Sequence, residues 1–90
     1  MTISVSIKRL VLDSLKPRET SIIDLSKAIC KVEGVEEVDI TVTEVDARTE
    51  TIKLTVRGTN VNYEKLSETL NHYGATIRSI DEINVGKLKT

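Results

Sequence analysis

The chain has 90 residues, of which 13 are Lys or Arg and 14 are Asp or Glu, so its formal net charge is −1. A nucleic-acid-binding arm needs a surplus of basic residues and a base-stacking surface needs aromatic ones, and the only aromatic residues here are two tyrosines. A chain this short forms one domain, whose small core commonly needs support from a disulfide, a metal or self-association. The single cysteine, Cys30, excludes an intrachain disulfide and favours a reducing, cytoplasmic setting.

The N-terminal segment begins as an alternating strand. Ile3, Val5 and Ile7 are separated by polar residues, which is typical of a strand with one buried face. Such a segment lacks the unbroken apolar run of a signal peptide or a membrane span, so no membrane association is expected. The pattern changes at residues 10–13, LVLD, where both faces of the strand become apolar before an acid.

Two interpretations explain the apolar residues on both faces. In a regular strand, one alternating set packs under helices and the other set faces outwards. A β-bulge near residues 8 and 9 would instead bring odd residues before it and even residues after it onto one face, which leaves only Val11 outside. For the regular strand, the outward residues are either Leu10 and Leu12, or Val5, Ile7 and Val11.

Two segments have the pattern of amphipathic helices. In residues 16–34, Thr20 or Ser21 is the candidate N-cap, apolar residues recur every three or four positions, and Gly34 can end the helix. In residues 60–74, Asn62 is the candidate N-cap and a glycine again follows the apolar stripe. The apolar stripe of each helix is expected to pack on a sheet.

The remaining segments predict three more strands. Residues 35–58 contain two alternating apolar runs around the polar sequence VDARTE, which is typical of a hairpin. Residues 75–85 form the last strand, in which isoleucines at every third position indicate a bulge or a loosely specified edge. Residues 86–90 are expected to be a flexible tail.

The order strand, helix, strand, strand, helix, strand predicts a single ferredoxin-like α+β domain over residues 1–90. In this βαββαβ fold, four antiparallel strands form one sheet and both helices cover one face. The other face is open, and its threonines together with the outward residues of the first strand predict a surface for self-association. The candidate residues of this oligomer face are Leu10, Leu12, Thr41, Thr43, Thr51, Lys53 and Thr55.

Four acids are predicted to gather at one end of the sheet, where the first two strands end and the third begins. Carboxylates are preferred ligands of Ca²⁺ and Mg²⁺, so a divalent cation site is one hypothesis. Basic residues are predicted at the same end, and ordinary surface ion pairs are the alternative explanation. The four acids are Asp13, Glu44, Asp46 and Glu50.

The start of the first helix is a second candidate site. Free N–H groups there can hold a small anion, and Lys16, Arg18 and Thr20 are expected beside it. A catalytic site is not indicated, because the single histidine, His72, has no serine or cysteine near it in sequence to form a pair of nucleophile and base. A non-enzymatic protein is therefore expected.

The sequence also resembles known families. The run GVEEVDITVTEVDARTETIKLTV resembles heavy-metal-associated domains, but the cysteine pair of those domains is absent, which leaves only a shared fold. The segments IKRLVLDSLKP, SIIDLSKAI, GVEEVDITVTEVDARTE and IRSIDEINVGK resemble, over nearly the whole chain, a small archaeal family known as domain of unknown function two hundred and eleven. This resemblance implies a ferredoxin-like fold, an archaeal cytosolic origin and ring-like homo-oligomers, and it implies no known activity.

Two hypotheses of function follow. The first is a non-enzymatic, self-assembling domain with a regulatory role, whose copies join through the open sheet face or through edge strands and close into a ring. The second is a module that binds a small ligand or a divalent cation, in the manner of amino-acid-sensing domains.

Overall fold

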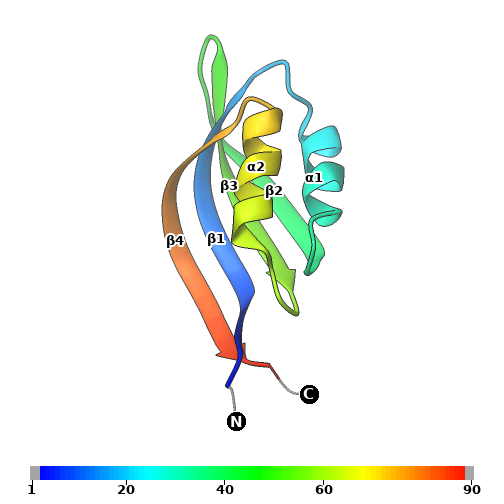
Figure 1. Ribbon diagram of the computed structural model, residues 1–90. Coiled ribbons are helices and arrows are strands. Elements are labelled where there is room, and N and C mark those ends of the chain that lie inside the picture. The colour runs from blue at the N-terminus through cyan, green and yellow to red at the C-terminus, as the bar shows by residue number, and fades with distance from the viewer. Residues whose placement is uncertain (1–2, 89–90) are drawn as a thin grey trace.

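The computed structural model describes residues 3–88 and confirms the expected order of elements. Four antiparallel strands form one sheet in the order β2-β3-β1-β4, and both helices lie on one face of it (Figure 1). This arrangement is the ferredoxin-like α+β fold. No helix in the described residues is long and apolar enough to cross a membrane. The elements are β1 (Val5–Pro17), α1 (Ile22–Cys30), β2 (Val35–Val45), β3 (Thr49–Gly58), α2 (Tyr63–His72) and β4 (Thr76–Lys87).

Both helices begin at the residues that the sequence indicated. The hydroxyl of Ser21 accepts hydrogen bonds from the backbone N–H groups of Ile23 and Asp24, at 3.1 and 3.4 Å. The side-chain oxygen of Asn62 accepts one from the N–H of Lys65 at 3.0 Å. Each cap satisfies N–H groups that the first turn of a helix leaves free.

The core lies between the helices and the sheet. Side chains of the two central strands, β1 and β3, form one side of the core, and the apolar stripes of α1 and α2 form the other. Burial of these side chains is the main favourable contribution to folding. The apolar residues with no exposed surface are Leu10, Leu12, Leu25, Ile29, Ile52, Leu54, Val56, Leu66 and Leu70.

A bulge in β1 decides which residues face the helices. Ile7 pairs with Val85 on β4, whereas Arg9 pairs with Asn84, so Lys8 is an additional residue in β1. The bulge interpretation is therefore confirmed. It brings Ile7, before the bulge, onto the same side of the sheet as the even residues after it.

The expectation that Leu10 and Leu12 face outwards is wrong. Both are fully buried in the core under the helices, because the bulge reverses the parity of the strand. Val11, between them, lies on the open face, yet it is only 1% exposed. The open face therefore has little apolar surface from the central strand.

The expected irregularity of the last strand consists of two bulges. Val11 and Leu12 pair with Glu82 and Ile80, and the residue between these partners, Asp81, has no place in the ladder. A second shift, two pairs further along the ladder, leaves Arg78 as the additional residue. Each bulge shifts the alternation of side chains between the two faces of the sheet by one residue. In consequence Ile77, Ile80 and Ile83 all lie on the helix side of the sheet.

The expected flexible tail is wrong for residues 86–88. Gly86 and Lys87 belong to β4, and the N–H of Leu88 donates to the carbonyl of Ser4 at 3.0 Å. These residues pair with the N-terminal segment, which their polar composition did not indicate. Residues 89 and 90 lie outside the described part of the chain.

Candidate functional site

An apolar surface remains exposed along the edge strand β4. In Figure 1 β4 is the strand furthest from the two helices, and β1 lies between β4 and α2. Among its helix-facing side chains, Ile77 near the start of the strand packs against the core, whereas those further along are exposed although they are on the same side of the sheet. We call this surface the β4 stripe. It consists of Ile80, Ile83 and Val85 with Val5 of the neighbouring strand, which are 48, 55, 51 and 62% exposed.

The backbone of β4 is also free on one side. β4 is the last strand in the sheet order, so its outer edge has no partner strand within residues 3–88. Unpaired N–H and C=O groups along an edge can pair with a strand of another molecule. The bulges at Arg78 and Asp81 interrupt this edge. The region from Glu82 to Lys87 is the longer uninterrupted part, and it contains half of the β4 stripe.

The opposite edge of the sheet has complementary properties. A hollow of about 230 Å³ lies between α1 and β2, and its lining includes Ile22, Ile23 and Ile40. Ile23 is 63% exposed there. The strand itself carries four acids and no basic residue: Glu36, Glu37, Asp39 and Glu44. The paired strands β1 and β4, which we call the β1–β4 ribbon, carry basic residues near the start of β1 and the end of β4. These residues are Lys8, Arg9 and Lys87.

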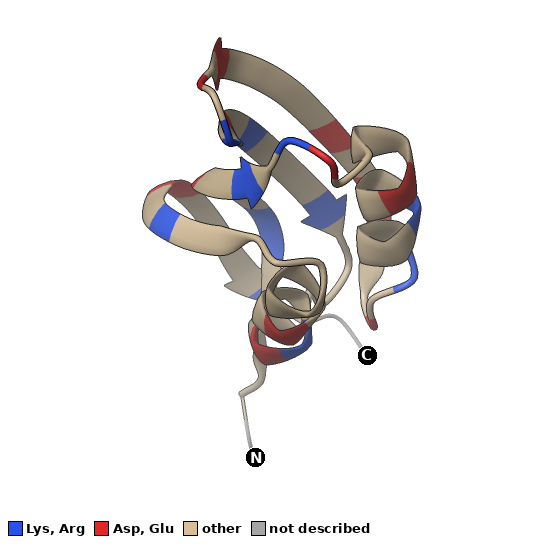
Figure 2. Ribbon diagram, turned by 90° about the horizontal axis from the view of Figure 1, so that it is seen from above, with Lys and Arg blue, Asp and Glu red and all other residues tan. Residues whose placement is uncertain are grey.

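The open face of the sheet carries ion pairs rather than an apolar patch. Arg57 donates to Glu37 and to Asp39, each at 2.7 Å, and Arg9 donates to Glu82 at 3.0 Å. The hydrogen bond and charge of Glu37, followed by those of Asp39, raise the pKa of Arg57 above the ordinary arginine value. Basic and acidic residues are interspersed over the molecule (Figure 2).

Four of the residues expected on the oligomer face do lie on the open face. They alternate with buried residues in the ladders of β2, β3 and β1. The fifth, Thr43, lies at a register shift of β2, where its hydroxyl donates to the carbonyl of Thr51 at 3.2 Å. Their contact with another subunit stays a prediction. The four residues are Thr41, Thr51, Lys53 and Thr55.

The four predicted metal-binding acids are not brought together. Asp13 lies on the open face, 3.8 Å from the Arg78 guanidinium, whereas Glu50 lies on the helix side and pairs with Lys16. Glu44 lies opposite Thr51 in the ladder, and Asp46 is in the turn between β2 and β3. Within residues 3–88, no three Asp, Glu, His or Cys side chains are placed to hold a metal ion. Strand alternation separates the acids that topology alone would gather.

Two of the three residues of the predicted anion site at the start of α1 are engaged within the chain. The Lys16 side chain is 1% exposed, and its ammonium donates to the carbonyls of Pro17 and Thr20, at 3.1 and 2.7 Å, and pairs with Glu50. All three of its protons are therefore used. Ser21 caps the helix N–H groups. The even parity that Lys16 shares with the core leucines is the signal that could have revealed its burial.

The hydroxyl of Thr20 is occupied as well, since it donates to the carbonyl of Tyr73 at 3.1 Å. Arg18 is exposed, and its backbone N–H donates to the carbonyl of Arg48 at 3.0 Å. These bonds join the β1–α1 connection to the end of α2 and to the hairpin turn. The segment has a structural role in the domain.

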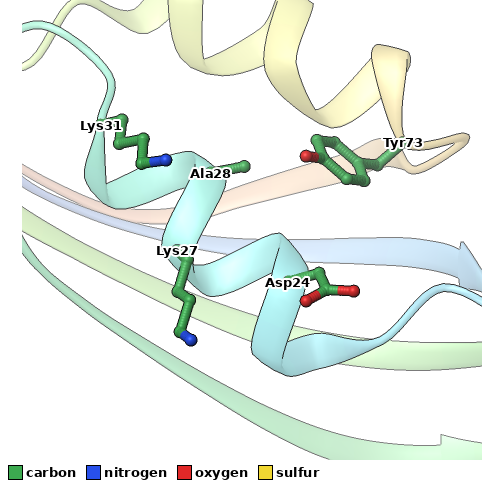
Figure 3. A pocket seen from close by; sticks show the side chains of 5 residues that line it. All are labelled: Asp24, Lys27, Ala28, Lys31 and Tyr73. Carbon is green, nitrogen blue, oxygen red and sulfur yellow. The ribbon is translucent and has the colours of Figure 1, made fainter.

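A groove between the helices was not anticipated from the sequence. One part of it, about 410 Å³, is lined by residues of α1 and by Tyr73 at the end of α2. Figure 3 shows the Tyr73 hydroxyl directed across the gap towards Ala28, with Lys31 at the end of the same helix. The only signal in the sequence is the spacing of Lys27 and Lys31, which places two cations four residues apart on one helix.

The fold and its two unlike edges define a small ferredoxin-like α+β domain with an uncovered edge strand. The chain belongs to the DUF211 family, described as uncharacterized ArCR, which it matches over residues 8–89. It is also similar to an uncharacterized protein of the archaeon Methanocaldococcus jannaschii, MJ0319. The two are 41% identical over 81 residues, which are 90% of this chain and 84% of that protein.

Proposed function

We propose that this chain is a non-enzymatic domain that assembles with further copies of itself through its two sheet edges. The observation that carries this proposal is the β4 stripe, because four large apolar side chains remain about half exposed beside a core that is otherwise fully covered. Contiguous apolar surface on a small domain marks an interaction site more often than isolated exposed residues do.

The expected gain from covering the stripe is substantial for so small a domain. Each of its half-exposed side chains contributes on the order of 1 kcal/mol when it is buried against a partner. Backbone hydrogen bonds along the free edge from Glu82 to Lys87 add to this gain. Together they favour association at concentrations at which a fully covered domain stays monomeric.

In the proposed assembly, the β4 stripe of one copy contacts the α1–β2 edge of the next copy. That edge has a hollow lined mainly by apolar residues for the stripe. Its acids Glu36 and Glu44 make no ion pair within residues 3–88, and neither do Lys8 and Lys87 of the β1–β4 ribbon, so these opposite charges can meet across the contact. A contact between two different surfaces is heterologous, so every copy keeps one free stripe and one free hollow. Repetition closes into a ring when the rotation between copies permits. The regulatory role expected from the sequence remains a prediction.

The open sheet face is the less favoured surface for this contact. Several of its charged residues, such as Arg57 and Arg9, are already paired within the chain, and desolvating such pairs is costly. The alternative function, a divalent cation module, has no three-ligand group among residues 3–88 to support it.

Native mass spectrometry at micromolar concentration tests the proposal, because it reports subunit number and retained small molecules together. We expect a single closed oligomer. A monomer across this concentration range would overturn the proposal. A dimer that forms no larger oligomer would contradict the heterologous contact and indicate an isologous one, in which both copies use the same surface.

A further inference from the structure

We propose that the groove between α1 and α2 binds a small polyanion, a molecule with several phosphate or carboxylate groups. This site is separate from the proposed assembly. The groove lies on the side of α1 that faces α2, whereas the hollow at the sheet edge lies on the side of α1 that faces β2.

The groove is one continuous feature along the two helices. The 410 Å³ hollow beside Tyr73 adjoins a second of about 310 Å³, and both are lined by Ala28 and Lys31. The small side chain of Ala28 leaves the space between the helices open. The combined groove is large enough for a small metabolite.

Three lysines line this groove, with Lys31 common to both hollows. Lys27 lines the first and Lys65 the second. Lys27 and Lys31 make no ion pair within residues 3–88. Figure 3 shows the Lys31 ammonium directed towards the gap and the Lys27 ammonium directed away from it, so Lys31 is the cation of α1 that is best placed for a ligand in the groove.

Helix electrostatics explains only part of this arrangement. The last turn of α1 favours cations such as Lys27. Lys65, however, lies in the first turn of α2, where the helix dipole disfavours a cation. Its pairing with Glu68, at 3.7 Å and between exposed side chains, is weak compensation. A ligand that contacts both helices accounts for Lys65 and Lys31 together.

The rest of the lining limits what the ligand can be. Tyr73 presents a hydroxyl donor and an aromatic ring, and Val32 supplies apolar surface. Of the two acids in the lining, Glu33 already accepts a hydrogen bond from the Asn62 side chain at 3.2 Å. Asp24 lies near the start of α1, about 10 Å along the helix from Lys31. The negative groups of the ligand therefore lie towards Lys31.

The test is a titration of the ¹⁵N-labelled chain with pyrophosphate, and separately with citrate, each against NaCl at matched ionic strength. We expect amide shifts at Lys31, Ala28 and Tyr73 that saturate at millimolar concentration or below. Saturation by pyrophosphate alone would assign a phosphate ligand, and saturation by citrate alone a carboxylate ligand. Shifts equal to those in NaCl would overturn the proposal.

Two matched variants locate the binding. Lys31→Ala is expected to weaken the apparent affinity at least tenfold, because it removes the cation common to both hollows. Lys53→Ala, a lysine of the open face, is expected to leave it unchanged. Equal effects of the two variants would overturn the site, and Lys65→Ala provides a second test on the other helix.

Discussion

Leu10 and Ile83 lie directly opposite one another in the ladder between β1 and β4, on the same side of the sheet, yet Leu10 is fully buried and Ile83 is 55% exposed. The difference arises from their positions in the sheet. β1 is central and its even-numbered leucines belong to the core, whereas β4 is the edge strand furthest from the helices. The apolar surface of the sheet thus continues beyond the part of it that this chain can bury.

Replacing Ile83 with Glu tests whether the β4 stripe makes the subunit contact. A charge in a buried apolar interface is costly to desolvate, so the variant is expected to be monomeric. Its own fold should change little, because the side chain is already half exposed. Native mass spectrometry measures the subunit number, and circular dichroism measures the fold.

The matched control for this variant is Thr76→Glu. Thr76 is an exposed residue of the same strand, opposite Leu15 on the open face. The Thr76→Glu substitution introduces the same charge as Ile83→Glu, but on the other side of β4. We expect it to assemble like the unaltered chain. Assembly of Ile83→Glu, or dissociation of both variants, would contradict the assignment of the stripe.

Lys16→Ala should strongly reduce the stability of the domain. It removes a buried ammonium from two carbonyls and from Glu50, and breaking a buried pair at one partner typically costs about 3 kcal/mol or more. Because Glu50 retains some access to solvent, we expect about 2 to 3 kcal/mol. Urea unfolding measures the change.

The double variant Lys16→Met with Glu50→Leu distinguishes charge from packing. Replacing both partners by apolar residues of similar size commonly restores stability. The double variant should therefore unfold at a higher urea concentration than Lys16→Ala. A single variant within about 0.5 kcal/mol of the unaltered chain would show that the buried pair is unimportant.

Alanine at two glycines with similar backbone angles should have unequal effects. Gly34 and Gly74 have φ values of 84° and 80°. A Cβ at Gly34 would lie 1.7 Å from the backbone oxygen of Asn60, whereas at Gly74 the nearest atom is a Pro17 side-chain carbon at 3.1 Å. Gly74→Ala should cost about 1 to 2 kcal/mol from the left-handed conformation alone.

Gly34→Ala should cost clearly more than Gly74→Ala, because the turn before β2 and the segment near Asn60 must separate. Thermal unfolding of the two variants in parallel measures the difference. Equal midpoints would mean that the close approach of these two segments contributes nothing to stability.

Asp13→Asn should have a small effect. The Asp13 carboxylate is 3.8 Å from the Arg78 guanidinium, and both side chains are partly exposed, so the pair is worth less than about 1 kcal/mol. Urea unfolding is again the measurement. Failure of the variant to fold would give Asp13 a structural role that its contacts do not indicate.

The sequence predicted most of the fold because local patterns report local structure. The helix cap at Asn62, the hairpin turn and the order of elements were indicated correctly, and the first cap is Ser21, one of the two residues that the sequence offered. Each depends on residues within a few positions of one another. The ferredoxin-like architecture then follows from that order.

The candidate sites were predicted less well because they depend on which face of the sheet each strand residue occupies. The acids were expected to gather at one end of the sheet, and topology does bring their strands together there. Asp13 and Glu50 nevertheless face opposite sides. A shift of one residue reverses a side chain's face, and no local pattern settles that shift with certainty when two interpretations fit.

The sequence by itself thus determined that this chain forms one ferredoxin-like domain, since caps, turns and periodicity act over short distances. Only the tertiary structure decided which face each strand residue occupies, through the bulges at Lys8, Arg78 and Asp81. A bulge is a mismatch between two paired strands far apart in sequence. For the same reason only the structure revealed the uncovered β4 stripe and the groove between the helices.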